Sequence, residues 1–200
     1  GFGYFGGNNI IYQVNLKTMR LVSQKSVGVQ LEGLNVGFAY DGYGYFGGTP
    51  LILKFDLMTL AVVNGQYLHH HVLTGFAYNG CGYFGGHGTI FQINLTTLET
   101  KKQNTVSTSK ILASVLDIED ETSFGYFGSY GKMIYKVNLT TLNVTARKNV
   151  GERLNSACCS GQVWGTESGK VLTIDAHTLN VDSSNNIGDG TINVVTTNFA

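Results

Sequence analysis

Short apolar runs bounded by glycine, asparagine or aspartate recur along this chain, and none shows sustained helical periodicity. Such runs are typical of β-strands when β-branched and aromatic residues dominate them. They do not alternate cleanly between apolar and polar positions, as expected for strands that are packed on both faces. In the stretch 34–63 the pattern predicts four strands, at Leu34–Tyr40, Tyr43–Gly47, Leu51–Asp56 and Leu60–Val63.

One aromatic phrase marks a repeating unit. Gly3-Tyr4-Phe5-Gly6-Gly7 returns with little change at Gly44, Gly82 and Gly125, and a degraded copy starts at Gln162. Successive copies begin 41, 38, 43 and 37 residues apart, and 41 residues lead from the last copy to the first if the chain ends are joined. A period near 40 in an all-β chain predicts a propeller, here with five blades.

A second phrase follows each aromatic phrase. It consists of asparagine or aspartate, two variable residues, threonine, and leucine or methionine. Asparagine and aspartate favour tight turns because their side chains bond the nearby backbone. We therefore expect a turn between the third and fourth strands of each unit. The copies begin at Asn15, Asp56, Asn94, Asn138 and Asp175.

With these phrases the whole chain resembles β-propeller repeat proteins whose blades carry Tyr-Phe-Gly and Lys-Val-Asp-Leu-type motifs. The resemblance implies an all-β, five-bladed β-propeller with four antiparallel strands per blade, in one domain covering 1–200. The chain begins at a second strand and ends with a first-strand pattern. We therefore expect Thr191–Asn198 to pair beside Gly3–Gly6, closing the ring and removing its open edge. The expected blades are 189–200 with 1–28, then 29–68, 69–108, 109–150 and 151–188.

Composition narrows the possible partners. Lys plus Arg and Asp plus Glu number 13 each, so the net charge is zero and no basic stripe suggests nucleic acid. No apolar run approaches the length needed to span a bilayer. Charged residues make up 13% of the chain, about half the usual share, so its surface relies on neutral polar residues.

Low charge and N-glycosylation sequons favour an extracellular or cell-surface protein, taken here as a mature or excised segment. Sequons begin at Asn94, Asn138 and Asn143, although a chain rich in Asn, Ser and Thr carries some by chance. Asn94 and Asn138 occupy turn positions that aspartate fills elsewhere, so Asn143 is the best candidate glycan carrier. The blade that carries Cys81 does not neighbour the blade that carries Cys158 and Cys159, so a bridge from Cys81 is not expected. All three cysteines are expected as free thiols.

The loops that join second to third strands, and one blade to the next, vary in length and type. Varied loops on a rigid scaffold are where binding usually occurs. Three imidazoles, at His69, His71 and His87, could meet and hold zinc or copper; the alternative is an exposed polar loop without metal, and no metal or cofactor is expected. The candidate binding residues are Tyr67, His69, His71, His87, Tyr130 and Lys132.

Catalytic signatures are scarce. Some five-bladed propellers are glycoside hydrolases, which need paired carboxylates. The carboxylates here lie mainly on one turn, which favours a solvated turn over an active site, and no catalytic residue is predicted. The residues considered are Asp117, Glu119, Asp120 and Glu121, with Glu32, Glu152 and Glu167 elsewhere.

The sequence favours a non-enzymatic extracellular module for assembly or adhesion, as a building block of a cell-surface or filamentous glycoprotein. Its expected partners are proteins, including further copies of the chain, or glycans. A lectin-like carbohydrate-binding propeller is one alternative, although the loop residues do not repeat from blade to blade. A glycoside hydrolase is the other alternative.

Overall fold

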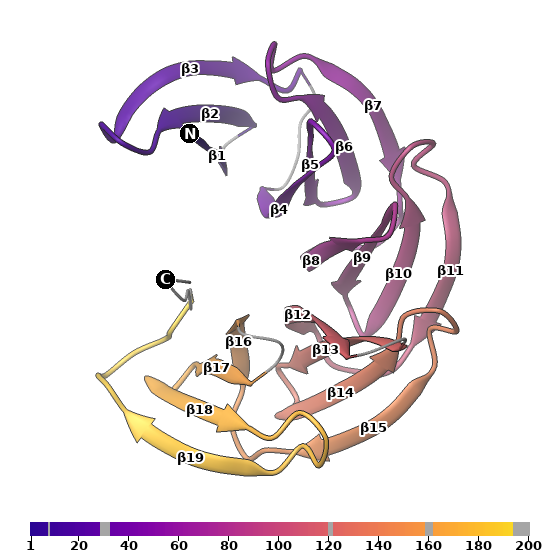
Figure 1. Cartoon of the computed structure of the whole chain (residues 1–200), viewed down its shortest axis with the longest axis vertical. Helices are drawn as coiled ribbons and strands as arrows, with labels where there is room; N and C mark the ends of the chain where they lie inside the picture. Colours follow the sequence, from indigo (N-terminus) through magenta and orange to yellow (C-terminus); the bar gives the residue numbers. More distant parts are fainter. Residues whose placement is uncertain (8, 29–32, 120–121, 159–161, 194–200) are drawn as a thin grey trace.

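The computed structural model describes residues 1–7, 9–28, 33–119, 122–158 and 162–193. In these ranges the chain forms nineteen strands in five antiparallel sheets, and no helix. Each sheet contains strands that are consecutive in the chain, and Figure 1 shows the sheets standing around a common centre. This arrangement confirms the predicted all-β propeller architecture. We number the sheets as the first to the fifth blade.

The first blade has three described strands and the other blades have four. The first blade contains β1 (Phe2–Gly7), β2 (Ile10–Asn15) and β3 (Arg20–Ser26). The second contains β4 (Leu34–Tyr40), β5 (Tyr43–Gly48), β6 (Leu51–Asp56) and β7 (Val62–Tyr67). The third contains β8 (Val72–Tyr78), β9 (Cys81–Gly86), β10 (Thr89–Asn94) and β11 (Thr100–Thr105). The fourth contains β12 (Ile111–Glu119), β13 (Thr122–Ser129), β14 (Met133–Asn138) and β15 (Val144–Asn149). The fifth contains β16 (Leu154–Cys158), β17 (Val163–Thr166), β18 (Lys170–Ile174) and β19 (Val181–Asn186).

The first strand of each complete blade faces the centre, and the last strand forms the rim (Figure 1). The middle strands of the second, third and fourth blades are largely buried because neighbouring blades cover both of their faces; β9 and most of β10 are buried along their length. The outer strand β11 is mostly exposed and polar. Dual coverage explains why the sequence shows apolar runs in place of clean alternation.

The turn between the third and fourth strands is built in the same way in every blade. In the second blade the Asp56 carboxylate accepts the backbone N–H groups of Met58 and Thr59. The N–H of Leu60 returns to the Asp56 carbonyl at 2.9 Å. Leu60 has a φ of 54°, a left-handed conformation that is unfavourable for a residue with a side chain. Burial of that side chain, which is 2% exposed, offsets the cost.

This turn corrects the predicted outer strand Leu60–Val63. The strand β7 begins at Val62 and extends to Tyr67, because Leu60 belongs to the turn. The same conformation recurs in the other blades at Met19, Leu98, Leu142 and Leu179, with φ between 53° and 65°. The predicted strands Leu34–Tyr40 and Leu51–Asp56 are confirmed at both ends.

Adjacent blades approach so closely that the glycine after each aromatic pair has no room for a side chain. A Cβ on Gly85 would lie 2.7 Å from Cγ2 of Ile111, which begins the inner strand of the next blade. A Cβ on Gly165 would likewise lie 2.6 Å from Cγ2 of Ile192. Ile192 thus occupies the place of a residue that begins an inner strand. The apolar residues seated in this way are Leu34, Val72, Ile111, Leu154 and Ile192.

A polar clasp joins each of the first four blades to the next. In the third blade the Tyr83 hydroxyl donates to the Leu139 carbonyl at 3.0 Å, in the fourth-blade turn, and the Gln92 amide donates to that hydroxyl at 2.9 Å. Burial raises the pKa of Tyr83 to about 12. The repeated tyrosine is therefore a core residue and also an inter-blade donor. The other pairs are Tyr4 with Leu57, Tyr45 with Leu95, and Tyr126 with Ala176.

Closure of the ring stays a prediction. Of the predicted closing strand Thr191–Asn198, residues 194–198 lie outside the described part of the chain. Residues 191–193 are described but are not in a strand, and among the described residues β1 pairs with β2 alone. The first and fifth blades form the two ends of the arc in Figure 1.

Candidate interaction face

The variable loops gather at one end of the sheets, which we call the loop face. It consists of the turns between second and third strands and the connections between blades. In every blade the residue that follows the outer strand donates its N–H to a carbonyl of the turn; in the third blade Val106 donates to Gly88 at 2.8 Å. Each connection is thereby tied to the turn of its own blade, and the loop face has a fixed backbone. The other bonds join Val27 to Asn9, Leu68 to Pro50, Val150 to Lys132 and Ile187 to Gly169.

One half of the loop face carries histidine and tyrosine from the second and third blades. The rings of His71 and His87 stack with centroids 4.4 Å apart and an interplanar angle of 14°. Nδ1 of His71 shares a hydrogen bond with the Thr49 hydroxyl. His69 instead packs edge-on against Tyr67, with centroids 4.5 Å apart. The structure brings His71 and His87 together, as predicted, but assigns His69 to a different pair.

The electrostatic setting disfavours protonation of His87. Partial burial lowers the pKa of His87, and the neighbouring His71, Lys110 and His70 lower it further. Parallel rings also direct their nitrogen lone pairs side by side, so they do not converge on one ion. Within the described part of the chain, no three His, Cys, Asp or Glu side chains form a group that could hold a metal.

The other half of the loop face lies between the fourth and fifth blades. The Arg153 guanidinium stacks over the Tyr130 ring, with Cζ 3.8 Å from the ring centroid, and it forms an ion pair with Glu167. The candidate Lys132 lies in the same region, lining a small cavity with Glu152 and Arg153. Tyr130 and Lys132 therefore share a polar surface, and Arg153, which sequence reasoning did not select, connects it to the fifth blade.

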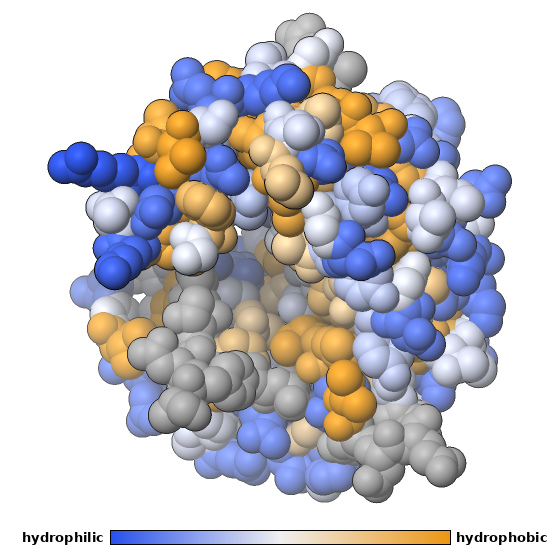
Figure 2. Space-filling view, turned by 45° about the horizontal axis from the view of Figure 1, so that its top comes forward, coloured by the Kyte–Doolittle hydropathy of each residue, from blue (hydrophilic) through white to orange (hydrophobic). Residues whose placement is uncertain are grey.

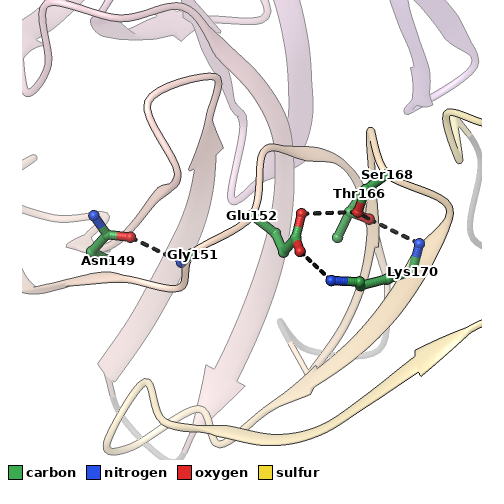
Figure 3. A network of polar contacts seen from close by, with 6 residues as sticks. All are labelled: Asn149, Gly151, Glu152, Thr166, Ser168 and Lys170. Atoms are coloured by element: carbon green, nitrogen blue, oxygen red, sulfur yellow. Dashed lines mark hydrogen bonds and ion pairs between the residues drawn. The ribbon is translucent and has the colours of Figure 1, made fainter.

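A neighbouring network fixes the connection into the fifth blade. The Glu152 carboxylate accepts hydrogen bonds from Lys170 at 2.6 Å and from the Ser168 hydroxyl at 2.9 Å (Figure 3). The Thr166 hydroxyl accepts the backbone N–H of Lys170 at 3.0 Å (Figure 3). The Lys170 hydrogen bond, chiefly, lowers the pKa of Glu152. This network orders the backbone that presents Arg153.

The carboxylates considered for hydrolysis lie in two places among the described residues, Asp117 on β12 and the pair Glu152 and Glu167 on the loop face. Asp117 is 5% exposed and accepts a hydrogen bond from the Tyr126 hydroxyl at 3.3 Å. Glu152 and Glu167 form ion pairs with Lys170 and Arg153 on the loop face. Three further candidates lie outside the described residues: Glu32, Asp120 and Glu121.

The remaining predicted positions fall on the opposite end or on the rim. Asn94 and Asn138 each use the side-chain oxygen to accept two backbone N–H groups of their turn. Asn143 is exposed directly before β15. Cys81 is a buried free thiol, and Cys159 lies outside the described residues.

Comparison with known proteins identifies the fold and leaves the family open. No protein-family model matches the chain, and no curated protein matches its sequence. A chain in the crystal structure of a mitotic checkpoint complex is similar, with a TM-score of 0.78 at 13% sequence identity. The match covers 96% of this chain, which spans 64% of the length of that chain. None of the described residues forms a helix long and apolar enough to cross a membrane. The likeness shows that this chain has the propeller fold.

Proposed function

We propose that this propeller is a non-enzymatic protein-interaction module that works through its loop face. The observation that carries the proposal is the contrast between the two ends of the blades. At one end all five turns follow a single construction, which serves the fold alone. At the other end each blade presents different side chains on a backbone held by the same hydrogen bond.

The chemistry of the loop face suits contact with a protein. Tyr67 and Tyr130 are 53% and 45% exposed. Tyrosine and arginine are enriched at protein interfaces because they combine apolar area with hydrogen-bonding groups. Stacking of Arg153 on Tyr130 holds both side chains in place before binding, which lowers the entropic cost of association.

The experiment changes the loop face without changing the core. Replacing Tyr67, His87 and Tyr130 together by alanine should leave the melting temperature within about 3 °C, because surface substitutions cost little stability. The same variant should weaken self-association at least about tenfold, as measured by sedimentation velocity over a concentration series. A matched control replaces Lys17, Met58 and Glu99 by alanine at the opposite end. Equal self-association of both variants and the parent would contradict the choice of surface.

We extend the proposal to an extracellular module for assembly or adhesion. Its support is the low charge of the chain and the exposed sequon at Asn143. Intact mass of native material before and after glycosidase treatment tests this. We expect one glycan, lost in the Asn143→Gln variant and kept in Asn94→Gln. A single unmodified mass would remove the support.

The proposal includes a ring closed by the C-terminal segment. Ile192 is seated on Gly165 as Leu154 is seated on Gly128, and its N–H donates to the Thr166 carbonyl at 2.9 Å. The Ser156 hydroxyl donates to the Ile192 carbonyl at 3.1 Å. The chain therefore leaves the fifth blade in the position from which each earlier blade begins its successor, which supports pairing of the segment with β1.

A further inference from the structure

Charge, more than hydropathy, distinguishes one part of the loop face. Hydrophilic and hydrophobic residues are interspersed over the surface in Figure 2, so hydropathy marks no docking patch among the residues coloured there. Between the fourth and fifth blades, however, charged and hydroxyl side chains line a cavity of about 210 Å³. This volume is below the usual range for ligand sites, so the cavity has room for one side chain. The lining residues are Lys132, Glu152, Arg153, Glu167 and Ser168.

The two carboxylates of the cavity already have cationic partners. Figure 3 shows Glu152 turned toward Lys170 and Ser168, and Glu167 is paired with Arg153. The Lys170 hydrogen bond is the main cause that lowers the pKa of Glu152, and Lys132 makes the smallest contribution. Within the described part of the chain, the Lys132 ammonium forms neither a hydrogen bond nor an ion pair. Lys132 is therefore a cation without an anionic partner of its own.

The charges in and around the cavity leave one positive charge in excess. Three cations stand against two carboxylates: Lys132, Arg153 and Lys170 against Glu152 and Glu167. Two exposed residues lie just outside and have opposite charges. The Lys110 carbonyl accepts the Tyr130 N–H, and Asp189 lies between two glycines whose carbonyls approach Gly169. They cancel each other, so the excess is that of Lys132.

The backbone at Lys132 shows that the turn itself does not favour a lysine. Lys132 has a φ of 64°, in the left-handed region that is unfavourable for a residue with a side chain. The residues in the same place in the third and fifth blades are Gly88 and Gly169, with φ of 74° and 77°. In all three blades the carbonyl of this residue accepts the N–H that follows the outer strand. Strain of this kind is typical of functional sites, where function selects a residue that the fold alone disfavours.

Arg153 adds hydrogen-bond donors in a fixed orientation. Its guanidinium is held over the Tyr130 ring, and its carbonyl accepts the Glu167 N–H at 3.1 Å. A guanidinium carries several N–H donors in a planar fork. Among the described residues its side chain donates to Glu167 alone. Donors therefore remain for a second carboxylate.

The excess of a single charge decides the class of ligand. One carboxylate neutralises it, whereas a phosphate group carries about −1.5 to −2 charge and would leave the site negative. A sugar acid would bring a ring into a cavity with room for one side chain, and Arg153 already covers one face of Tyr130. The side chain of an aspartate or glutamate in a polypeptide meets both limits.

We propose that Lys132 and Arg153 form a subsite for the carboxylate of one acidic side chain of a partner protein. Lys132 supplies the charge, and Arg153 supplies oriented N–H donors. The inference rests on the proposed function and names the chemistry of one of its contacts. Tyr67 and His87 would then contact other parts of the same partner.

The test uses N-acetyl-glutamic acid amide as the probe and the full 200-residue chain at low ionic strength. We expect saturable shifts of the backbone amide signals of Lys132, Arg153 and Ser168 in ¹H–¹⁵N NMR spectra, with a dissociation constant on the order of millimolar. N-acetyl-glutamine amide has the same shape without the charge and should bind at least about tenfold more weakly. N-acetyl-phosphoserine amide and the methyl glycoside of N-acetylneuraminic acid test the dianion and the sugar acid, and both should bind more weakly than the glutamate probe.

Variants of Lys132 separate its charge from its backbone. Lys132→Gln removes the charge and should weaken the glutamate probe about tenfold, whereas Lys132→Arg keeps the charge and should bind within about threefold of the parent. Lys132→Gly should weaken the probe about tenfold and raise the melting temperature by about 2 °C, because glycine relieves the strained φ. Higher stability with weaker binding is a result that a purely structural lysine would not give. Asn9→Gly, at the same place in the first blade with a φ of 62°, is the matched control and should leave binding unchanged.

The proposal is overturned if the glutamate probe does not saturate, if the glutamine, phosphoserine or sugar probe binds as tightly, or if Lys132→Gln binds like the parent. Failure of the proposed function gives a different result. In that case the Tyr67, His87 and Tyr130 variant would keep its self-association, while the glutamate probe still saturates the parent with the expected effects of the Lys132 variants.

Discussion

The first and third blades carry the same aromatic phrase but bury it to different extents. Phe84 and Leu98 of the third blade are both 0% exposed, whereas their counterparts Phe5 and Met19 are 52% and 72% exposed. The third blade packs between the second and fourth blades, whereas the first blade packs against the second alone as far as the described residues show. The repeat thus specifies a shape that can be buried on both faces, and the neighbouring blade determines whether burial occurs.

Removal of the segment expected to close the ring should have the largest effect on how the first and fifth blades are covered. Deleting Gly190–Ala200 takes away Ile192 from its seat on Gly165 and should leave the fifth blade open as well. We expect the melting temperature to fall by about 10 °C with loss of a single cooperative transition, in calorimetry. Ile187→Ser, at a residue 67% exposed, is the control. Unchanged melting of the deletion would contradict closure.

Truncating the same aromatic side chain in both blades measures how far each side chain is buried in solution. Phe84→Ala should cost about 3–5 kcal/mol in urea unfolding, because it empties a filled interface. In a closed ring Phe5 is covered too, so Phe5→Ala should cost about 2 kcal/mol or more. A cost of Phe5→Ala below about 0.5 kcal/mol, the level of a surface substitution, would show that the first blade is open in solution.

The polar clasps should contribute less to the free energy of unfolding, and their contribution should depend on pH. Burial raises the pKa of Tyr45 and Tyr83 to about 12, against about 10 for tyrosine in an unfolded chain. Both folded-state values are raised, so this stabilisation is complete below about pH 10 and lost as the pH rises through 12. Urea unfolding should therefore show falling stability from about pH 10 to 12.

Phenylalanine variants separate the clasp from its ring. Tyr83→Phe should cost about 1–2 kcal/mol at neutral pH and flatten the alkaline loss. Tyr4→Phe, in the clasp of the half-open first blade, should cost less than Tyr83→Phe. An alkaline profile of the Tyr45→Phe, Tyr83→Phe double variant equal to that of the parent would assign the loss to other groups.

The smallest expected effect is at the loop face. Partial burial holds the pKa of His87 below its ordinary value, so the folded protein binds this proton less readily than the unfolded chain. That stabilisation is present above about pH 6.5 and is lost as the pH falls. His87→Gln should reduce the decrease in melting temperature between neutral and mildly acid pH by about 1–2 °C. An unchanged decrease would mean that His87 does not contribute to the pH dependence of stability.

Local pattern predicted the strands well where one rule was sufficient. Leu34–Tyr40 and Leu51–Asp56 are apolar runs with turn residues at their ends, and both were predicted to the residue. Leu60 was assigned to a strand because the turn phrase marks where the turn begins but not where it ends. The last residue of the phrase has a positive φ in all five blades, whether it is buried as at Leu60 or exposed as at Met19.

The candidate site was predicted in part. The repeat placed the loops of neighbouring blades together, so His69, His71 and His87 were expected to meet; His71 and His87 are in contact, whereas His69 packs on Tyr67. Arg153 was missed because only its contact with Tyr130, which lies in the preceding blade, makes it part of the loop face. Likewise, the carbonyl that accepts the Tyr83 hydroxyl is a backbone group and leaves no mark on the sequence.

The clasps give the array a polarity. Every clasp runs forward, from a tyrosine in one blade to the turn carbonyl of the next, so the second, third and fourth blades each have a donating side and an accepting side. The fifth blade has Val163 and Thr173 where earlier blades have tyrosine and lysine or glutamine. It therefore accepts as the others do but lacks these donors, like the end unit of a directional polymer. Blades could be inserted before it without loss of linkage, whereas a blade placed after it would join without a clasp.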